Sequence, residues 1–234
     1  MTLKVTTFSS KGRATRLYSY KTKRIHHLQS DNQLNIFLLM EWIDAIIDIK
    51  ENIELKDWGT MNNIDNLRLD KFTDKKTGEL FQLHTNFLIK VLKNGVYEEI
   101  AISVKSLSEL ERKTVIEKLE IERRYWKANN IKLYLITEKE IDKQFVKNIK
   151  WVREALISKT IENINEIAEN LYYFMENNTQ KLVKDTFNQF EEENNLKIGT
   201  GLFAFRYLIA NKEIEIDMKK DINLNKEIMK IVKF

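Results

Sequence analysis

The stretch from His84 to Lys105 constrains the fold of this chain more than any other part of the sequence. Lys93-Asn94-Gly95 near its middle has the residue types of a turn, which predicts two strands joined at that point. The second strand alternates between two faces, as a strand must. One face carries Ile100, Ile102 and Val104, and the other carries Ala101, Ser103 and Lys105.

The segments around this hairpin predict a mixed sheet covered by helices. A helix capped by Ser30 or Asp31 is expected to run to about Ile47, followed by an extended segment. After the hairpin, a helix from Ser108 to about Asn129 leads into a buried strand from Ile131 to Thr137. Strand, helix and strand in this order indicate a βαβ-like crossover, and therefore an α/β fold.

The last third of the chain predicts a separate, smaller domain. The pattern changes around residues 157–162, so we expect domains at 1–158 and 159–234. The second contains three helical segments, at about 161–177, 179–193 and 201–210, and an alternating strand from Glu213 to Met218. Three helices and a small hairpin are typical of a winged helix. A helical docking domain without a DNA role fits the slightly acidic charge of this region equally well.

Charge is distributed unevenly along the chain. Residues 1–30 contain seven Lys and Arg residues and no Asp or Glu, which suits contact with phosphates, although a solvated basic tail is the common alternative. No apolar run could span a bilayer, and cysteine is absent, so we expect a cytoplasmic protein without a membrane partner or thiolate metal site. The candidate DNA-binding residues are Arg16, Lys21, Lys23, Arg24, His26 and His27.

The hairpin also carries a pattern that suits phosphodiester hydrolysis. That reaction uses carboxylates to hold Mg²⁺ and a lysine near the attacking water. Asn86, Ser103 and Lys105 stand at strand ends with suitable spacing, and the helix after Asp31 offers Gln33 and, two turns on, Glu41 as a further ligand. A lysine at the end of a strand is more often a solvated residue at the rim of the sheet. Spacing alone therefore does not show that Lys105 belongs to a nuclease site.

Several runs in order resemble one family. The sequence is similar to TnsA, the endonuclease subunit of heteromeric transposases that also contain TnsB and the ATPase regulator TnsC. The runs are RLYSYKTKRIHHLQSD (Arg16 to Asp31), FLLMEW (Phe37 to Trp42), DIKE (Asp48 to Glu51), TNFL (Thr85 to Leu88), ISVK (Ile102 to Lys105) and EKLEIERRYW (Glu117 to Trp126).

This resemblance implies a restriction-endonuclease-like catalytic domain followed by a winged helix. It implies cuts in the 5′ strands at transposon ends with Mg²⁺, for which Mn²⁺ can substitute. The implied partners are transposon-end DNA, a TnsB-like transposase and a TnsC-like ATPase. Carried over to this chain, the motif acids fall at Gln33 and Asn86, the motif lysine at Lys105, a position often held by Gln at Ser103, and an acidic helix residue near the metal site at Glu122.

Two departures from the family pattern change the expectation. Both principal carboxylates appear as amides, Gln33 for Glu and Asn86 for Asp. An amide keeps nearly the same shape, but it is uncharged and its NH₂ group cannot bind a cation. We interpret the pair as a cleavage-deficient site, either engineered or natural. The alternatives are an inactive architectural subunit and, less in keeping with the matched runs, a stand-alone restriction-type nuclease.

Overall fold

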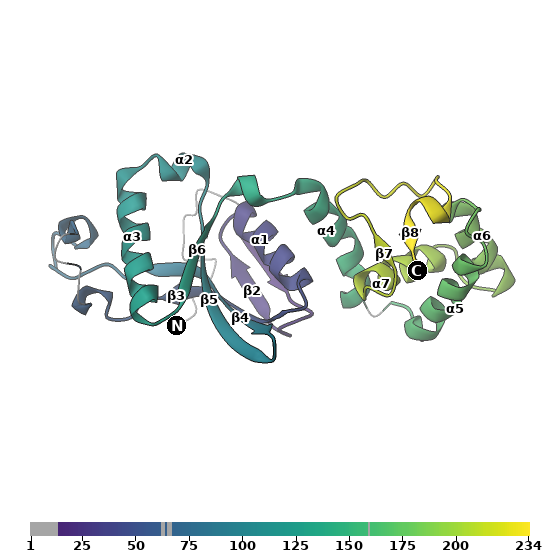
Figure 1. Cartoon of the computed structure of the whole chain (residues 1–234), viewed down its shortest axis with the longest axis horizontal. Coiled ribbons are helices and arrows are strands. Elements are labelled where there is room, and N and C mark those ends of the chain that lie inside the picture. Colours follow the sequence, from purple (N-terminus) through teal and green to yellow (C-terminus); the bar gives the residue numbers. More distant parts are fainter. Residues whose placement is uncertain (1–13, 62–63, 65–66, 159) are drawn as a thin grey trace. The chain divides into compact units, whose positions relative to one another are not determined.

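The computed structural model describes residues 14–61, 64, 67–158 and 160–234, which form two compact units (Figure 1). The first extends to Ile141 and the second runs from Asp142 to Phe234. This division lies before the boundary expected after residue 158, because helix α4 (Lys143–Ile157) packs against α7 (Thr200–Ala210) of the second unit. In the described part of the chain, no helix has the length and apolarity needed to cross a membrane.

The predicted hairpin lies in the middle of the sheet of the first unit. Strands β4 (His84–Lys93) and β5 (Val96–Val104) pair antiparallel. Asn94 and Gly95 form the turn with φ angles of 51° and 79°, in the left-handed region that these residue types tolerate best. The hairpin predicted from the turn residues is therefore confirmed.

Two more strands complete a mixed sheet with the order β3-β4-β5-β6. Strand β3 (Ile46–Glu54) is antiparallel to β4, whereas β6 (Lys132–Ile136) runs parallel to β5 after a helical crossover. The mixed sheet and the crossover are confirmed. The expectation that the last strand is buried is wrong: Tyr134 and Leu135 are exposed, because β6 is at the sheet edge and the helices cover it incompletely.

Helices cover both faces of this sheet (Figure 1). Helix α1 (Asp31–Trp42) packs on one face, where the ring centroids of Phe37 and Phe87 are 6.5 Å apart. Helix α1 ends at Trp42, before the expected Ile47, because the following residues leave the helix and pair with β4. Local helix propensity is weak beside the hydrogen bonds and burial that a sheet provides.

The helix expected from Ser108 to Asn129 is in fact two helices, α2 (Leu107–Leu110) and α3 (Lys113–Ala128). A capping box starts α2: the Ser106 hydroxyl accepts from the Glu109 N–H, and the Glu109 carboxylate accepts from the Ser106 N–H. Helix α3 covers the second face of the sheet, and its Ile121 and Trp126 share a core cluster with Ala101 of β5.

Shorter elements complete the first unit. Strands β1 (Thr15–Tyr18) and β2 (Ile25–Leu28) form an antiparallel pair. The long connection before β4 contains 3₁₀ turns η2 (Trp58–Thr60) and η3 (Leu69–Phe72), and η4 (Glu138–Glu140) precedes α4. The polar sequence of residues 56–80 predicts a loop with one short helix around Met61 to Leu67, a range that lies partly outside the described residues.

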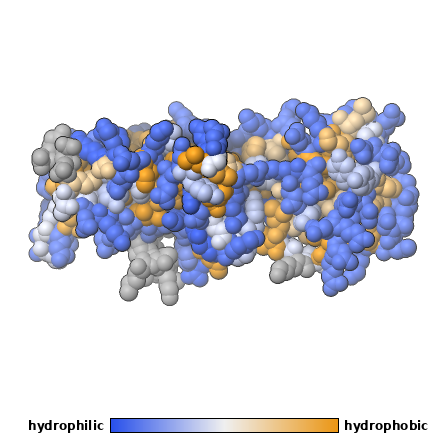
Figure 2. Space-filling model, turned by 60° about the horizontal axis from the view of Figure 1, so that its bottom comes forward, coloured by the Kyte–Doolittle hydropathy of each residue, from blue (hydrophilic) through white to orange (hydrophobic). Residues whose placement is uncertain are grey.

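The second unit contains the three helices predicted for it, α5 (Ile164–Glu176), α6 (Val183–Glu193) and α7. Strand β7 (Glu215–Ile216) pairs antiparallel with β8 (Val232–Lys233), which follows the 3₁₀ turn η5 (Ile228–Lys230). Helices followed by a two-stranded pair match the order expected for a winged helix. Hydrophilic residues dominate the face shown in Figure 2, with small hydrophobic patches between them.

Candidate active site

A pocket of about 750 Å³ lies where β5 ends, between the start of α1 and the α2–α3 region. It brings together three of the residues that the sequence predicted for the site: Gln33, Asn86 and Lys105. The other lining residues are Gln29, Ser30, Asn32, Val104, Ser106, Ser108, Glu109, Arg112 and Lys118.

Asn86 ties the two hairpin strands together through its side chain. Its Oδ1 accepts hydrogen bonds from the Val104 backbone N–H at 2.7 Å and from Lys105 Nζ at 3.3 Å. A backbone N–H can only donate, so this contact requires the amide oxygen at that position. The oxygen is thus occupied within the protein, and the NH₂ group has no hydrogen-bond partner among the described residues.

Gln33 has the same arrangement at the start of α1. Its side-chain Oε1 accepts from the Gln29 backbone N–H at 3.0 Å, which again fixes the orientation of the amide. Its own backbone N–H donates to the hydroxyl of Ser30, the residue that caps α1. In the described part of the chain its NH₂ group has no hydrogen-bond partner.

Lys105 supplies the cationic group beside the two amides. Besides its contact with Asn86, Nζ donates to the Val104 carbonyl at 3.2 Å. Burial lowers the pKa of the Lys105 ammonium, and the charge of Lys118 lowers this pKa further, while Glu122 and Glu109 oppose that shift. A lysine in such a position can contact a phosphate oxygen or a water near it.

Ser103 and Glu122, also expected in the site, do not line the pocket. Ser103 is fully buried, and its hydroxyl has no hydrogen-bond partner among the described residues. Glu122 is fully buried on α3, where Oε2 accepts from the Thr85 hydroxyl at 3.1 Å. That hydroxyl accepts from the Trp126 indole N–H at 2.8 Å, so Glu122 belongs to a polar network in the core.

Two cationic lining residues were missed by the sequence analysis. Lys118 on α3 donates to the His84 carbonyl at 3.2 Å, and its Nζ lies 3.8 Å from Glu122 Oε1. Arg112 lies between α2 and α3 and pairs with Glu109 at 3.3 Å. The four-residue spacing of Lys118 and Glu122 on one helix was the available signal. From this pair the sequence analysis selected only Glu122, as an acidic residue near the metal site.

Three of the six predicted DNA-binding residues use their side chains for contacts within the fold. Lys21 Nζ donates to the carbonyls of Ile43 and, at 2.6 Å, Ile46, just beyond α1. Arg24 donates to the Ile49 carbonyl and forms an ion pair of 3.1 Å with Asp48. These contacts hold the β1–β2 turn on β3.

His26 corrects the expectation most clearly, because its side chain is 0% exposed and cannot lie against DNA. Its Nδ1 is 2.6 Å from Glu51 Oε2, its Nε2 is 2.7 Å from the Thr22 hydroxyl, and its ring centroid is 4.6 Å from that of Phe37. Burial raises the pKa of Glu51, but hydrogen bonding and charge interaction with His26 outweigh burial and leave this pKa lowered.

Three predicted DNA-binding residues remain. Arg16 and Lys23 are exposed, whereas His27 is half-buried and donates its backbone N–H to Glu51 at 3.3 Å. The first thirteen residues, with Lys4, Lys11 and Arg13, lie outside the described residues. Arg16 and Lys23 are therefore the described members of the predicted set whose positions best suit a phosphate contact.

The pocket does not fit the magnesium site that the resemblance implies. The described residues contain no group of three or more His, Cys, Asp or Glu side chains that could hold a metal ion. The oxygens of Gln33 and Asn86 already accept hydrogen bonds from the backbone. Mg²⁺ prefers anionic oxygen ligands, and the one carboxylate that lines the pocket, Glu109, is already held by Arg112 and the Ser106 N–H.

A second pocket, of about 380 Å³, adjoins the first and shares Gln29, Asn86 and Lys118 with it. His84 lines it at the start of β4. Burial lowers the pKa of the His84 imidazole, and Lys118 lowers this pKa further, against the opposing effect of Glu54. The two pockets form one polar surface beside the hairpin.

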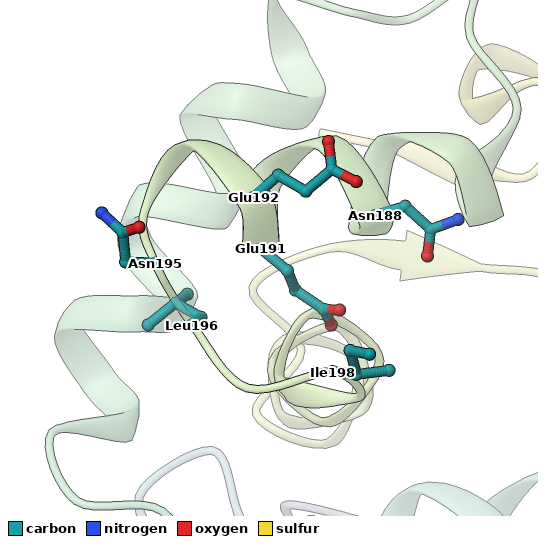
Figure 3. A pocket seen from close by; sticks show the side chains of 6 residues that line it. All are labelled: Asn188, Glu191, Glu192, Asn195, Leu196 and Ile198. Carbon is teal, nitrogen blue, oxygen red and sulfur yellow. The ribbon is translucent and has the colours of Figure 1, made fainter.

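Another pocket, of about 540 Å³, lies in the second unit (Figure 3). The Glu191 carboxylate points toward the start of α7, where Oε1 accepts from the N–H groups of Gly199 at 3.0 Å and Gly201 at 2.7 Å. The run from Glu191 to Glu193 predicts a solvated helix end, but Glu191 is buried, so this prediction is wrong for that residue. Its carboxylate satisfies the N–H groups at a helix start, which is a structural role.

Comparison with known proteins places this geometry in a family. Residues 44–138 match the family model described as the TnsA-like endonuclease N terminal, and residues 140–218 match the TnsA endonuclease C terminal. The Transposon Tn7 transposition protein TnsA of Escherichia coli is 30% identical over 217 residues, covering 93% of this chain and 78% of that protein. The chain belongs to the TnsA endonuclease family. Of the three pocket residues predicted from sequence, Asn86 and Lys105 lie inside the match to the TnsA N-terminal model, and Gln33 precedes it.

Proposed function

We propose that this chain acts at transposon ends as the TnsA-type subunit of a Tn7-like transposase, with TnsB-like and TnsC-like partners, and that it does not cut DNA as written. Membership in an endonuclease family supports the general role. The Lys105 and Asn86 arrangement at the end of the β4–β5 hairpin supports the location of the site.

The proposed loss of cleavage rests on the two amides beside Lys105. Gln33 and Asn86 line one pocket beside Lys105, and each turns an uncharged NH₂ group away from its backbone contact. Carboxylates at these positions would keep the backbone contacts and would add two negative charges next to the lysine. The present site keeps the shape of a nuclease site and lacks the charge that would recruit a metal ion.

The double substitution Gln33→Glu and Asn86→Asp tests the proposal. With both acids restored, Mg²⁺ or Mn²⁺ would bind there and neutralise charge at the scissile phosphate, so we expect nicking of the 5′ strands of transposon-end DNA in the presence of the partners. The unsubstituted chain should give no product, and the double variant that also carries Lys105→Ala should lose the product again.

Circular dichroism and thermal unfolding of each variant show whether it is folded. A correctly folded double variant that stays inert with Mg²⁺, Mn²⁺ and the partner proteins would refute the site assignment. Nicking by the unsubstituted chain would refute the proposed loss of cleavage.

A second candidate function is that of an architectural subunit, which joins DNA and partner proteins without any cleavage step of its own. The two amides favour this function, because they preserve the fold of the site without its charge. We expect the unsubstituted chain to assemble with end DNA and both partners to the same extent as the double variant. Assembly that depends on the restored acids would contradict this candidate.

A further inference from the structure

The replacement of two acids by amides changes the sign of the charge around the pocket. Lys105, Arg112 and Lys118 line it together with one carboxylate, Glu109, and the buried carboxylate of Glu122 lies behind Lys118. These five groups leave one net positive charge. Acids at positions 33 and 86 would turn this into one net negative charge.

The uncharged groups of the pocket are also mainly donors. The amide oxygens of Gln33 and Asn86 accept from backbone N–H groups, and their NH₂ groups have no partner among the described residues, which leaves these donors for a ligand in the pocket that both residues line. Ser30 and Ser108 add hydroxyl groups at the rim. Gln29 and Asn32 add further amides to the lining, so an anion with several oxygens finds both positive charge and several donors.

The adjoining pocket extends this property. Its lining contains no Asp or Glu, and it shares Lys118 and Asn86 with the main pocket. The surface formed by the two pockets therefore offers positive charge and amide donors. Glu109 is the one carboxylate in its lining, and it is held by Arg112 and the Ser106 N–H.

We propose that the pocket formed by Gln33, Asn86, Lys105 and Lys118 binds a phosphate group directly and without a divalent metal ion. The phosphate would be that of a DNA backbone or free phosphate, since both present the same oxygens. This inference rests on the proposed function for its location, but it assigns the amidated site a ligand of its own. The two amides are donors to that ligand and are more than inert replacements.

The experiment follows the side-chain NH₂ resonances of Gln33 and Asn86 by NMR in the full chain while inorganic phosphate is added in EDTA. We expect both resonances to shift along one saturating curve, with no change in affinity when Mg²⁺ replaces EDTA. A short DNA duplex added in place of phosphate should shift the same resonances if the backbone is the source. Shifts with phosphate alone would assign the site to free phosphate.

Affinity of the variants comes from calorimetric titration with inorganic phosphate. The isosteric double variant Gln33→Glu/Asn86→Asp should bind phosphate in EDTA roughly tenfold more weakly or worse, because two donors become anions facing the ligand. Lys118→Ala should also weaken binding, and its matched control Lys127→Ala, an exposed lysine on the same helix, should not.

Unshifted amide resonances in EDTA, or a strict requirement for Mg²⁺, would overturn the proposal. Equal phosphate affinity for the unsubstituted chain and a folded double variant would overturn it as well. These results are independent of nicking: the double variant can cut DNA while the unsubstituted chain fails to bind phosphate, or the reverse. The two proposals can therefore fail separately.

Discussion

Two regions of the first unit are rich in cationic and polar side chains: the β1–β2 turn with its neighbouring residues, and the pocket beside the β4–β5 hairpin. They differ in how far these side chains form hydrogen bonds within the fold. In the first region, carbonyl and carboxylate groups of the same unit form hydrogen bonds with Lys21, Arg24 and His26. In the second, Gln33 and Asn86 line a pocket and have NH₂ groups without a partner among the described residues. The difference shows that the hydrogen bonds a polar group already makes decide whether it is available to a ligand.

The largest effect that separates the two regions is expected from His26→Ala. The substitution removes the buried partner of Glu51 and the ring packed on Phe37, and it should lower the free energy of unfolding by roughly 3–5 kcal/mol. Urea unfolding followed by circular dichroism measures it. Arg16→Ala on the adjacent strand is the exposed control, with a change of at most about 0.5 kcal/mol. Similar values for the two variants would mean that His26 has no structural role.

An intermediate effect should distinguish Lys21 from Lys23 within the basic segment. Lys21→Met removes donors to the Ile43 and Ile46 carbonyls and should cost roughly 1–2 kcal/mol of stability. Lys23→Met should leave stability unchanged and reduce the slope of log affinity for DNA against log salt by about 0.9 for the lost phosphate contact.

Measurements of DNA affinity at several salt concentrations, together with unfolding curves, decide between the two roles. The sequence predicted that Lys21, Lys23 and Arg24 all contact phosphates. A reduced salt slope for Lys21→Met with no loss of stability would support that prediction. It would contradict the structural role assigned to Lys21.

The smallest effect concerns pH dependence at the edge of the pocket. Burial and Lys118 lower the pKa of His84 in the folded state from its usual value of 6.5, so the unfolded chain takes up a proton more readily. This contribution to stability is fully present above pH 6.5 and is lost as the pH falls below that value. His84→Gln should therefore show a shallower loss of thermal stability between neutral and acidic pH than the unsubstituted chain, while Gln82→Ala should keep the original slope. An identical slope for His84→Gln would contradict the assigned shift.

Strand pairing was largely predictable from local signals. Asn94 and Gly95 required a left-handed turn, and the alternation from Ile100 to Lys105 gave the two faces of β5 correctly. Helix limits were less predictable, since the residues up to Ile47 carry no stop signal and pairing with β4 ends α1 early. Propensity acts over a few residues, whereas sheet pairing joins residues distant in sequence.

The candidate site was predictable in part. The spacing and the resemblance selected Gln33, Asn86 and Lys105, and the structure places all three on one pocket. They also selected Ser103 and Glu122, which the structure places in the core beside that pocket. The hydroxyl of Ser103 is too short to line the pocket, and the carboxylate of Glu122 is held in the core by Thr85. Sequence spacing does not show how far a side chain extends or which groups hold it.

The sequence by itself determined the hairpin, the order of strands and helices, the family, and the replacement of two acids by amides. Only the tertiary structure decided which cations are free and which way the two amides face. The physical reason is that backbone N–H and C=O groups in a folded chain must find partners, so a side-chain group that satisfies them has less hydrogen-bonding capacity left for a ligand. Lys21 donates to two carbonyls beyond α1, whereas Asn86 accepts from one N–H of β5 and has an NH₂ group without a partner among the described residues at the pocket.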